Sequence, residues 1–279
     1  MLEKAVFGRA ADAIGKSRSL IITAGAGMGV DSGLPDFRGP RGFWRAYPAY
    51  EKIGISFVEA ANPRHFESDP SFGWGFYGHR LNMYRETVPH PGFSLLLKWI
   101  DSFGLNSFVV TSNVDGHFRK AGFDSMRILE VHGSIHFLQC TRPCGRTIWE
   151  NHEEIPVDIS TMHARRVPMC AACGAHARPN ILMFGDYSWI SDRTDAQHDA
   201  FETFLRNDCP APLTIIEIGA GTAIPTIRNL SESLGTKFGA TVIRINPGEP
   251  QIQLPQMALE CSALDGLRGI DSALSGMEL

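Results

Sequence analysis

The chain has 279 residues, of which 43% are hydrophobic, and a formal net charge of −4 at pH 7, so it can bury the core of one large or two modest domains. The slightly acidic balance excludes a surface that attracts nucleic acid or anionic membranes as a whole. Without a signal-peptide pattern or an apolar run of roughly 20 residues, we expect a cytoplasmic protein with no direct nucleic-acid or membrane partner.

Short β-branched runs predict the strands of a buried parallel sheet. Each run is followed by polar, Gly or Asn residues, and segments with helical periodicity, such as 92–102 and 201–205, lie between them. This alternation predicts an α/β fold with a doubly wound parallel sheet, whose ligands bind at the carboxyl ends of the strands. The predicted strands are residues 20–23, 107–111, 127–131, 213–218 and 240–245.

A glycine-rich loop follows the first predicted strand. Gly25, Ala26 and Gly27 occupy a junction of strand and helix, where a backbone without Cβ can approach a pyrophosphate. The full Gly-x-Gly-x-x-Gly pattern is missing, and no acidic residue ends a second strand about 20 residues later. The polar segment Asp36-Phe37-Arg38 nevertheless favours a binding loop over a tight turn without a ligand.

Two segments interrupt the alternation of strands and helices. Residues from about 40 to 91 are rich in aromatic side chains and predict a loop and short helices over the crevice, whereas residues from about 137 to 182 contain two cysteine pairs. We therefore expect residues 1–39, 92–136 and 183–279 to form the sheet domain. The inserts 40–91 and 137–182 are expected to form a smaller helical and zinc-ribbon domain.

The two cysteine pairs predict a structural metal site. A stretch of 25 residues separates the pair Cys140 and Cys144 from the pair Cys170 and Cys173, and four thiolates complete a tetrahedron around Zn²⁺. Four protein ligands leave no open coordination position, which favours a structural ion. The alternatives are a reduced loop without metal, or replacement of one cysteine by a nearby histidine: His152, His163 or His176.

Six motifs resemble those of the sirtuins, which are NAD-dependent protein deacylases, and they follow one another in the order that the family has. The resemblance spans roughly residues 19 to 265. The motifs are residues 25–38, 111–115, 131–134, 179–186, 219–222 and 245–246.

The resemblance implies an enzyme that removes acyl groups from protein lysine side chains. Such an enzyme consumes NAD, releases nicotinamide and O-acyl-ADP-ribose, and carries one structural Zn²⁺. The implied partners are NAD and an acylated lysine of a protein or peptide. The implied fold is a Rossmann-like sheet with a smaller zinc-ribbon and helical module.

The resemblance also assigns catalytic roles. His132 would act as general base towards the ribose hydroxyls, a role that suits an imidazole with an ordinary pKa of about 6.5. Asn113 and Asp115 would handle the nicotinamide end of the cofactor. The alternatives are a strand-end histidine bonded to backbone and two helix-capping side chains.

The remaining site residues follow from the same motifs. Tyr77 and Arg80 lie on one face of a predicted helix and resemble a pair that binds succinyl and malonyl groups, although a packed tyrosine beside a solvated arginine remains the alternative. The implied substrate contacts are Tyr77, Arg80, Val114, Phe184 and Gly185. The implied cofactor contacts are Gly25, Ala26, Gly27, Asp36, Phe37, Arg38, Ser112, Asn113, Val114, Asp115, Gly219, Gly221, Thr222 and Asn246.

The chain departs from the family pattern at four positions. Gly29 and Ala223 replace serines, Asp186 replaces the more common glutamate, and Ser112 replaces a glutamine credited with contacting the nicotinamide ribose. Ser112 keeps a second reading open, an NADase or protein ADP-ribosyltransferase using the same pocket. A non-catalytic NAD-sensing zinc-ribbon protein is the third.

Overall fold

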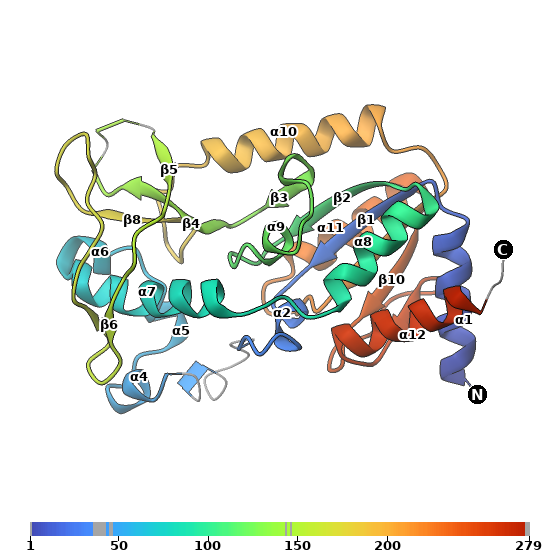
Figure 1. Ribbon diagram of the computed structural model, residues 1–279, viewed down its shortest axis with the longest axis horizontal. Helices are drawn as coiled ribbons and strands as arrows, with labels where there is room; N and C mark the ends of the chain where they lie inside the picture. The colour runs from blue at the N-terminus through green and yellow to red at the C-terminus, as the bar shows by residue number, and fades with distance from the viewer. Residues whose placement is uncertain (1, 36–42, 45–46, 143, 146, 277–279) are drawn as a thin grey trace.

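The largest element of the fold is a parallel sheet. The computed structural model describes residues 2–35, 43–44, 47–142, 144–145 and 147–276 (Figure 1). In this part of the chain, six parallel strands pair in the order β11-β10-β9-β1-β2-β3. The strands are β1 (Ser19–Ala24), β2 (Asn106–Thr111), β3 (Ile128–Glu130), β9 (Leu213–Ile218), β10 (Thr241–Ile245) and β11 (Met257–Leu259).

The structure confirms the predicted doubly wound α/β fold and adds an edge strand. All five predicted runs are strands of this sheet, but β11 was not predicted. Its three residues follow a segment rich in Pro and Gln, and only pairing with β10 makes them a strand. Three residues are too few to establish a period-2 pattern in the sequence.

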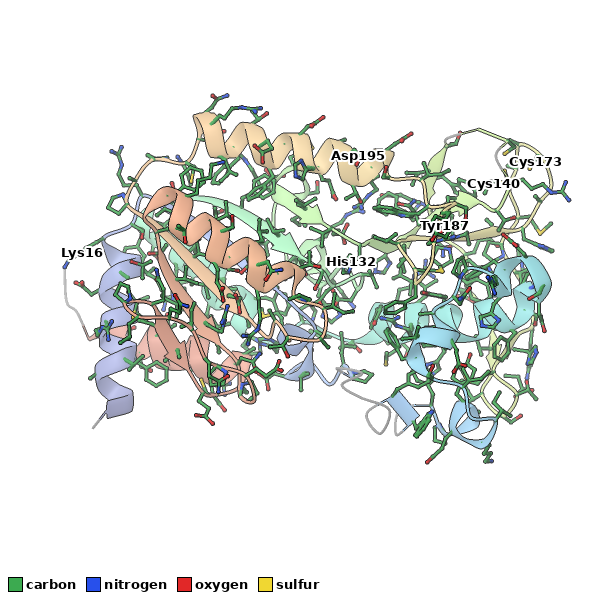
Figure 2. The ribbon with its side chains drawn as sticks, turned by 180° about the vertical axis from the view of Figure 1, so that it is seen from behind. Lys16, His132, Cys140, Cys173, Tyr187 and Asp195 are labelled. Atoms are coloured by element: carbon green, nitrogen blue, oxygen red, sulfur yellow. The ribbon has the colours of Figure 1, made fainter. Side chains whose placement is uncertain are left out.

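Helices cover both faces of the sheet. Along β1, Leu20 and Ile22 pack with one group of helices, whereas Ile21 packs with the other. In Figure 1, α8 and α12 lie in front of the strands, and in Figure 2 the view from behind shows α11 in front. The first group is α1 (Leu2–Gly15), α8 (Gly92–Phe103) and α12 (Ala263–Ser275). The second is α10 (Asp192–Asn207) and α11 (Thr226–Phe238).

A second group of elements, which we call the small module, has its own apolar cluster. Its strands form a three-stranded antiparallel sheet in the order β5-β4-β8 and a two-stranded sheet of β6 and β7. The helices of the module are α4 (Pro48–Lys52), α5 (Phe57–Ala60), α6 (His65–Ser68) and α7 (Pro70–Glu86). The strands are β4 (Gly133–Cys140), β5 (Ile148–Glu150), β6 (Val157–Asp158), β7 (His163–Ala164) and β8 (Ala177–Ile181).

Aromatic side chains account for much of the small module's core. Phe43, Tyr47, Tyr50 and Phe76 form a set of ring contacts with centroid distances of 5.3 to 6.0 Å. The aromatic-rich segment that the sequence singled out is therefore a packed core.

Short helical segments complete the description of the fold. They follow strand ends or precede strands and are α2 (Gly27–Val30), α9 (His117–Lys120) and the 3₁₀ helix η1 (Ser125–Arg127). Within the described residues, every helix is too short or too polar to cross a lipid bilayer.

Candidate active site

The main cavity lies between the large sheet and the small module and has a volume of about 720 Å³. One wall consists of loops that follow β1, β2, β3 and β9, as expected for a doubly wound sheet. The opposite wall consists of α5, α7 and the segment after β8. The predicted site residues that line it are Gly25, Ala26, Tyr77, Arg80, Ser112, Asn113, Val114, Asp115, His132, Phe184, Gly219 and Gly221.

The two glycine turns of this wall contact each other directly. A Cβ at Gly25 would lie 2.8 Å from backbone atoms of Gly219 and Ala220. Gly219 has a φ of +63°, and a Cβ there would lie 2.4 Å from the backbone of Gly27. The Gly27 N–H donates to the Gly219 carbonyl at 3.0 Å. Glycine is therefore required here by the packing of one turn on the other.

The loop after β2 presents Asn113 and Asp115 to the cavity. The Asn113 side-chain amide donates to the Gly25 carbonyl at 2.9 Å, which ties the ends of β1 and β2 together. The Asp115 carboxylate accepts the His117 backbone N–H at 2.9 Å, and the His136 ring bonds to the Asp115 carbonyl at 2.8 Å. These hydrogen bonds hold the loop that carries the Asn113 and Asp115 side chains.

The Asp115 carboxyl is buried, and burial raises its pKa to about 6. The hydrogen bond from His117 and the positive charge of Arg80 oppose this shift. The group is mostly ionised above neutral pH and titrates within the range in which enzymes are assayed.

His132 lies in the two-residue link between the large sheet and the small module. The Val131 N–H donates to the Thr111 carbonyl at 2.9 Å, and the Leu182 N–H donates to the His132 carbonyl at 3.0 Å. Figure 2 places His132 in the middle of the molecule, away from Cys140 and Cys173 at one end.

Burial lowers the pKa of His132, and a hydrogen bond to the Ser112 backbone opposes the shift. The imidazole is therefore neutral near pH 7, which is the form that a general base needs.

Arg80 and Tyr77 on α7 face the cavity from the small module. The Arg80 Nε and Nη2 atoms donate to the Tyr84 hydroxyl at 2.9 and 2.6 Å. Tyr77 is buried, and burial raises its pKa to about 12, so its hydroxyl is protonated and able to donate. Arg80 is also buried, which is inconsistent with a solvated arginine.

A buried ion pair shapes the segment that carries Phe184 and Gly185. The Arg178 and Asp186 side chains are 2% and 0% exposed. Arg178 Nη2 also donates to the Ile181 carbonyl at 2.7 Å, and the Asp186 carboxylate accepts the Ser188 N–H at 3.0 Å. Asp186, in place of the more common glutamate, is thus integrated into this loop.

Four predicted contacts do not line the cavity: Gly27, Gly185, Thr222 and Asn246. Asn246 is fully buried, donating to the Ala220 carbonyl at 2.8 Å and accepting from the Gly248 and Glu249 N–H groups at 3.0 Å. The Thr222 N–H donates to the Glu249 carboxylate at 2.9 Å. The predicted contacts Asp36, Phe37 and Arg38 lie outside the described residues.

Other residues line the cavity without having been predicted. Tyr84 lies one turn beyond Arg80, so the (i, i+4) spacing on α7 was a usable signal. The others come from segments whose approach to the sheet depends on tertiary packing. They are Leu34, Pro35, Ser56, Phe57, Val58, Ala61, Ile181, Leu182, Met183, Ala223 and Ile224.

The four predicted metal ligands form a compact cluster at the end of the small module. The sulfur atoms of Cys140 and Cys173 are 3.6 Å apart, those of Cys144 and Cys170 are 3.7 Å apart, and all four lie within 4.8 Å of one another. Sulfurs about 2.3 Å from a tetrahedral zinc would lie about 3.8 Å apart. The cluster therefore fits one structural Zn²⁺, and no histidine belongs to it among the described residues.

The raised pKa of Asp115 predicts a pH-dependent stability for Asp115→Asn. Relative to an ordinary value of 3.8, a folded-state pKa of about 6 stabilises the protein fully below 3.8, and this stabilisation is lost as pH rises through 6. A shift of about 2 pH units corresponds to about 3 kcal/mol. Asparagine does not ionise, so the variant does not lose stability in this way as the pH rises. The free energy of unfolding of Asp115→Asn, relative to wild type, should therefore rise between pH 4 and pH 8.

Denaturant unfolding of both proteins across this pH range checks the prediction. A difference between them that stays constant with pH would contradict the assigned pKa.

The fold and the site together define the class of this protein. It has a Rossmann-like sheet with two glycine turns in contact, a histidine at the cavity and a cysteine metal site. The Sir2 family model matches residues 25–206. The chain belongs to the Sir2 family.

Curated relatives and solved structures agree with this assignment. An NAD-dependent protein deacylase of Aeropyrum pernix is 31% identical over 265 residues, covering 92% of this chain and 96% of that protein. One of Thermococcus kodakarensis is 32% identical over 181 residues, and the match spans 65% of that relative's length. A Sir2 homologue in complex with NAD has the same fold, with a TM-score of 0.75 at 24% identity over 97% of this chain and 94% of that one. A mutant Sir2 homologue in complex with ADP-ribose gives 0.72 at 25% identity, over 97% and 98%.

Proposed function

We propose that this protein is an NAD-dependent protein-lysine deacylase. The observation that carries the proposal is that His132, Asn113 and Asp115 line one cavity with the glycine turns after β1 and β9. The curated relatives named NAD-dependent protein deacylases support the same activity. A protein that only bound NAD would not need a buried, neutral imidazole at this position.

Bound NAD would supply an electrophilic ribose carbon as nicotinamide leaves. The two glycine turns would hold the pyrophosphate with backbone N–H groups, as strand-to-helix turns do. Asp115 would accept from the carboxamide, and Asn113, already bonded to Gly25, would orient the ribose end. His132 would take a proton from a ribose hydroxyl through the ring nitrogen that does not bond to the Ser112 carbonyl.

The acyl end of the substrate would lie against α7. Arg80 is held by Tyr84 with Nε and Nη2, and both Arg80 and Tyr77 line the cavity. A guanidinium in this environment suits a carboxylate, and a tyrosine hydroxyl can add a second donor. We propose that short acidic acyl groups, succinyl or malonyl, are accepted in addition to acetyl.

Arg80→Met should reduce succinyl-lysine turnover far more than acetyl-lysine turnover. A charge-assisted hydrogen bond contributes about 1.5–3 kcal/mol, so kcat/KM for the succinyl peptide should fall roughly 10- to 100-fold more than for the acetyl peptide. Assays at pH 8 keep Asp115 ionised, because removal of the Arg80 charge favours its protonated form.

Arg85→Met is the matched control on the same helix. The Arg85 guanidinium bonds to the carbonyls of Asn151 and Glu153 and does not line the cavity. It should leave the ratio of the two activities unchanged, and an equal loss of both in Arg80→Met would exclude the carboxylate role.

Products identify the reaction directly. Purified protein with NAD and a panel of acetyl-, succinyl- and longer acyl-lysine peptides should yield nicotinamide, free lysine peptide and O-acyl-ADP-ribose by mass spectrometry. Free ADP-ribose or ADP-ribosylated protein, formed without an acyl peptide, would instead indicate the NADase or transferase activity. Ser112, which lines the cavity, is the residue that keeps this second activity in view.

We also propose that the chain divides into the two domains expected from its sequence. The separate apolar cluster of the small module supports this division. A cytoplasmic location is proposed because thiolate metal ligands persist in a reducing compartment.

A further inference from the structure

A second, much smaller chamber adjoins Asp115 and is partly open to solvent at Arg119 and Ser125. Its volume is about 20 Å³, and Asp115 is the one described residue that lines both this chamber and the main cavity. A chamber of this size holds one water molecule if two or more polar groups face it. Thr111, Glu130, Arg193 and Gln197 also line it.

Two of these residues form a largely buried ion pair. Arg193 Nη2 on α10 lies 2.5 Å from Glu130 Oε2 at the end of β3, and their side chains are 19% and 8% exposed. The Arg193 guanidinium carbon lies 4.0 Å from the centroid of the Phe137 ring. Gln197 Oε1 accepts the Glu130 N–H at 3.1 Å, so α10 holds the end of β3 through side chain and backbone. In Figure 1, α10 runs along the top of the molecule, above β3.

One nitrogen of the Arg193 guanidinium does not take part in the ion pair. Arg193 Nη1 is buried and has no hydrogen-bond partner among the described residues. Buried donors of this kind are normally satisfied by protein groups or ordered water. The chamber that Arg193 and Asp115 share provides a place for such a water.

We propose that one water molecule in this chamber links the Arg193 guanidinium to the Asp115 carboxyl, so that the Glu130–Arg193 pair sets the charge state of Asp115. Neither residue lines the main cavity, and both are therefore positioning residues. The inference about catalysis rests on the proposed function, because it requires Asp115 to act on bound cofactor. The coupling itself does not.

The two charges of the pair act in opposite directions on Asp115. The negative charge of Glu130 favours protonated Asp115, whereas the positive charge of Arg193 favours its ionised form. Glu130 also responds to Arg193, because burial raises the pKa of Glu130 and Arg193 opposes this shift. The other titratable groups around the pair stay the same when either residue is changed. These are Arg80 and Tyr84 from α7, His117, Arg119 and Lys120 from α9, and His136 from β4.

Glu130→Gln and Arg193→Met should therefore shift the titration of Asp115 in opposite directions. Thermal unfolding is measured as a function of pH without cofactor. Wild type and each variant are each compared with the same protein that also carries Asp115→Asn. The difference within each pair isolates Asp115. The midpoint of the Asp115 titration should move down by about 0.5–1 pH unit in Glu130→Gln. It should move up by less in Arg193→Met, because unpaired Glu130 is then more readily protonated and loses part of its charge.

Two further variants control for structural damage. Arg193→Lys keeps the positive charge and should restore the midpoint towards the wild-type value. Arg127→Met removes an arginine from the half-exposed Arg127–Asp208 pair and should leave the midpoint unchanged. Shifts in the same direction, or no shift, would overturn the proposal, as would a high-resolution crystal structure showing a dry chamber.

The acid limb of kcat/KM for acyl-lysine peptides gives the second readout. It should move with the unfolding midpoints, down in Glu130→Gln and up in Arg193→Met. Opposite shifts in unfolding together with an absence of deacylase activity would uphold the charge coupling and refute the proposed function. Deacylase activity without either shift would uphold the proposed function and refute the charge coupling.

Discussion

His132→Ala should lower kcat for deacylation by about 10²- to 10⁴-fold, the range that a lost general base costs. Binding of ADP-ribose should change little, because backbone hydrogen bonds hold the segment of His132 in place. The Val131 N–H donates to the Thr111 carbonyl, and the Leu182 N–H donates to the His132 carbonyl. Steady-state kinetics with an acyl peptide and calorimetry with ADP-ribose separate the two effects.

His152→Ala is the matched control for this variant. The His152 side chain is 82% exposed, pairs with Glu150 and lines neither cavity. It should retain wild-type turnover. Undiminished hydrolysis in His132→Ala would remove the base assignment, and a parallel loss of ADP-ribose binding would indicate a structural role.

The pH profile should not follow the ordinary pKa of histidine. Burial lowers the pKa of His132, whereas burial raises that of Asp115 to about 6. Activity that requires ionised Asp115 and neutral His132 falls on the acid side as either group takes up a proton. Protonation of Asp115 therefore contributes an acid limb near pH 6.

Removal of the zinc should produce the largest loss of stability. Cys140→Ser deletes one corner of the tetrahedron, and structural zinc sites contribute folding energy outright. We expect loss of the one zinc equivalent and a decrease of at least about 3 kcal/mol in the free energy of unfolding, detected by metal analysis and denaturant titration.

The loss should affect peptide binding more than cofactor binding. The segment of Phe184 and Gly185 follows β8, which begins four residues after Cys173, whereas the glycine turns belong to the large sheet with its own apolar clusters. Cys209→Ser, which changes a half-buried thiol outside the cluster, should retain its zinc. A Cys140→Ser protein with full zinc content and wild-type stability would contradict the four-cysteine assignment.

Local sequence signals predicted the large sheet and half of the residues that line the cavity. Each of the five predicted strands lies in a largely buried apolar run. The residues at the strand ends, such as Asn113 and His132, converge because parallel strands end at one edge of the sheet. The four cysteines were equally predictable from their spacing.

Contacts between distant segments account for what the sequence did not reveal. Gly25 suggests a phosphate loop, but its closest steric partner is Ala220, almost 200 residues away in the chain. Asn246 lies at a strand end like the other polar residues, yet its amide is consumed by neighbouring backbone groups. The role of Glu130 and Arg193 likewise depends on how α10 crosses β3.

The Arg178–Asp186 pair has a consequence for engineering peptide preference. It holds the loop after β8 from beneath, while Tyr187 on this loop is fully exposed and Leu182, which lines the cavity, is 39% exposed. Figure 2 labels Tyr187. Randomised libraries at these two positions should therefore yield altered selectivity without selecting for misfolded clones.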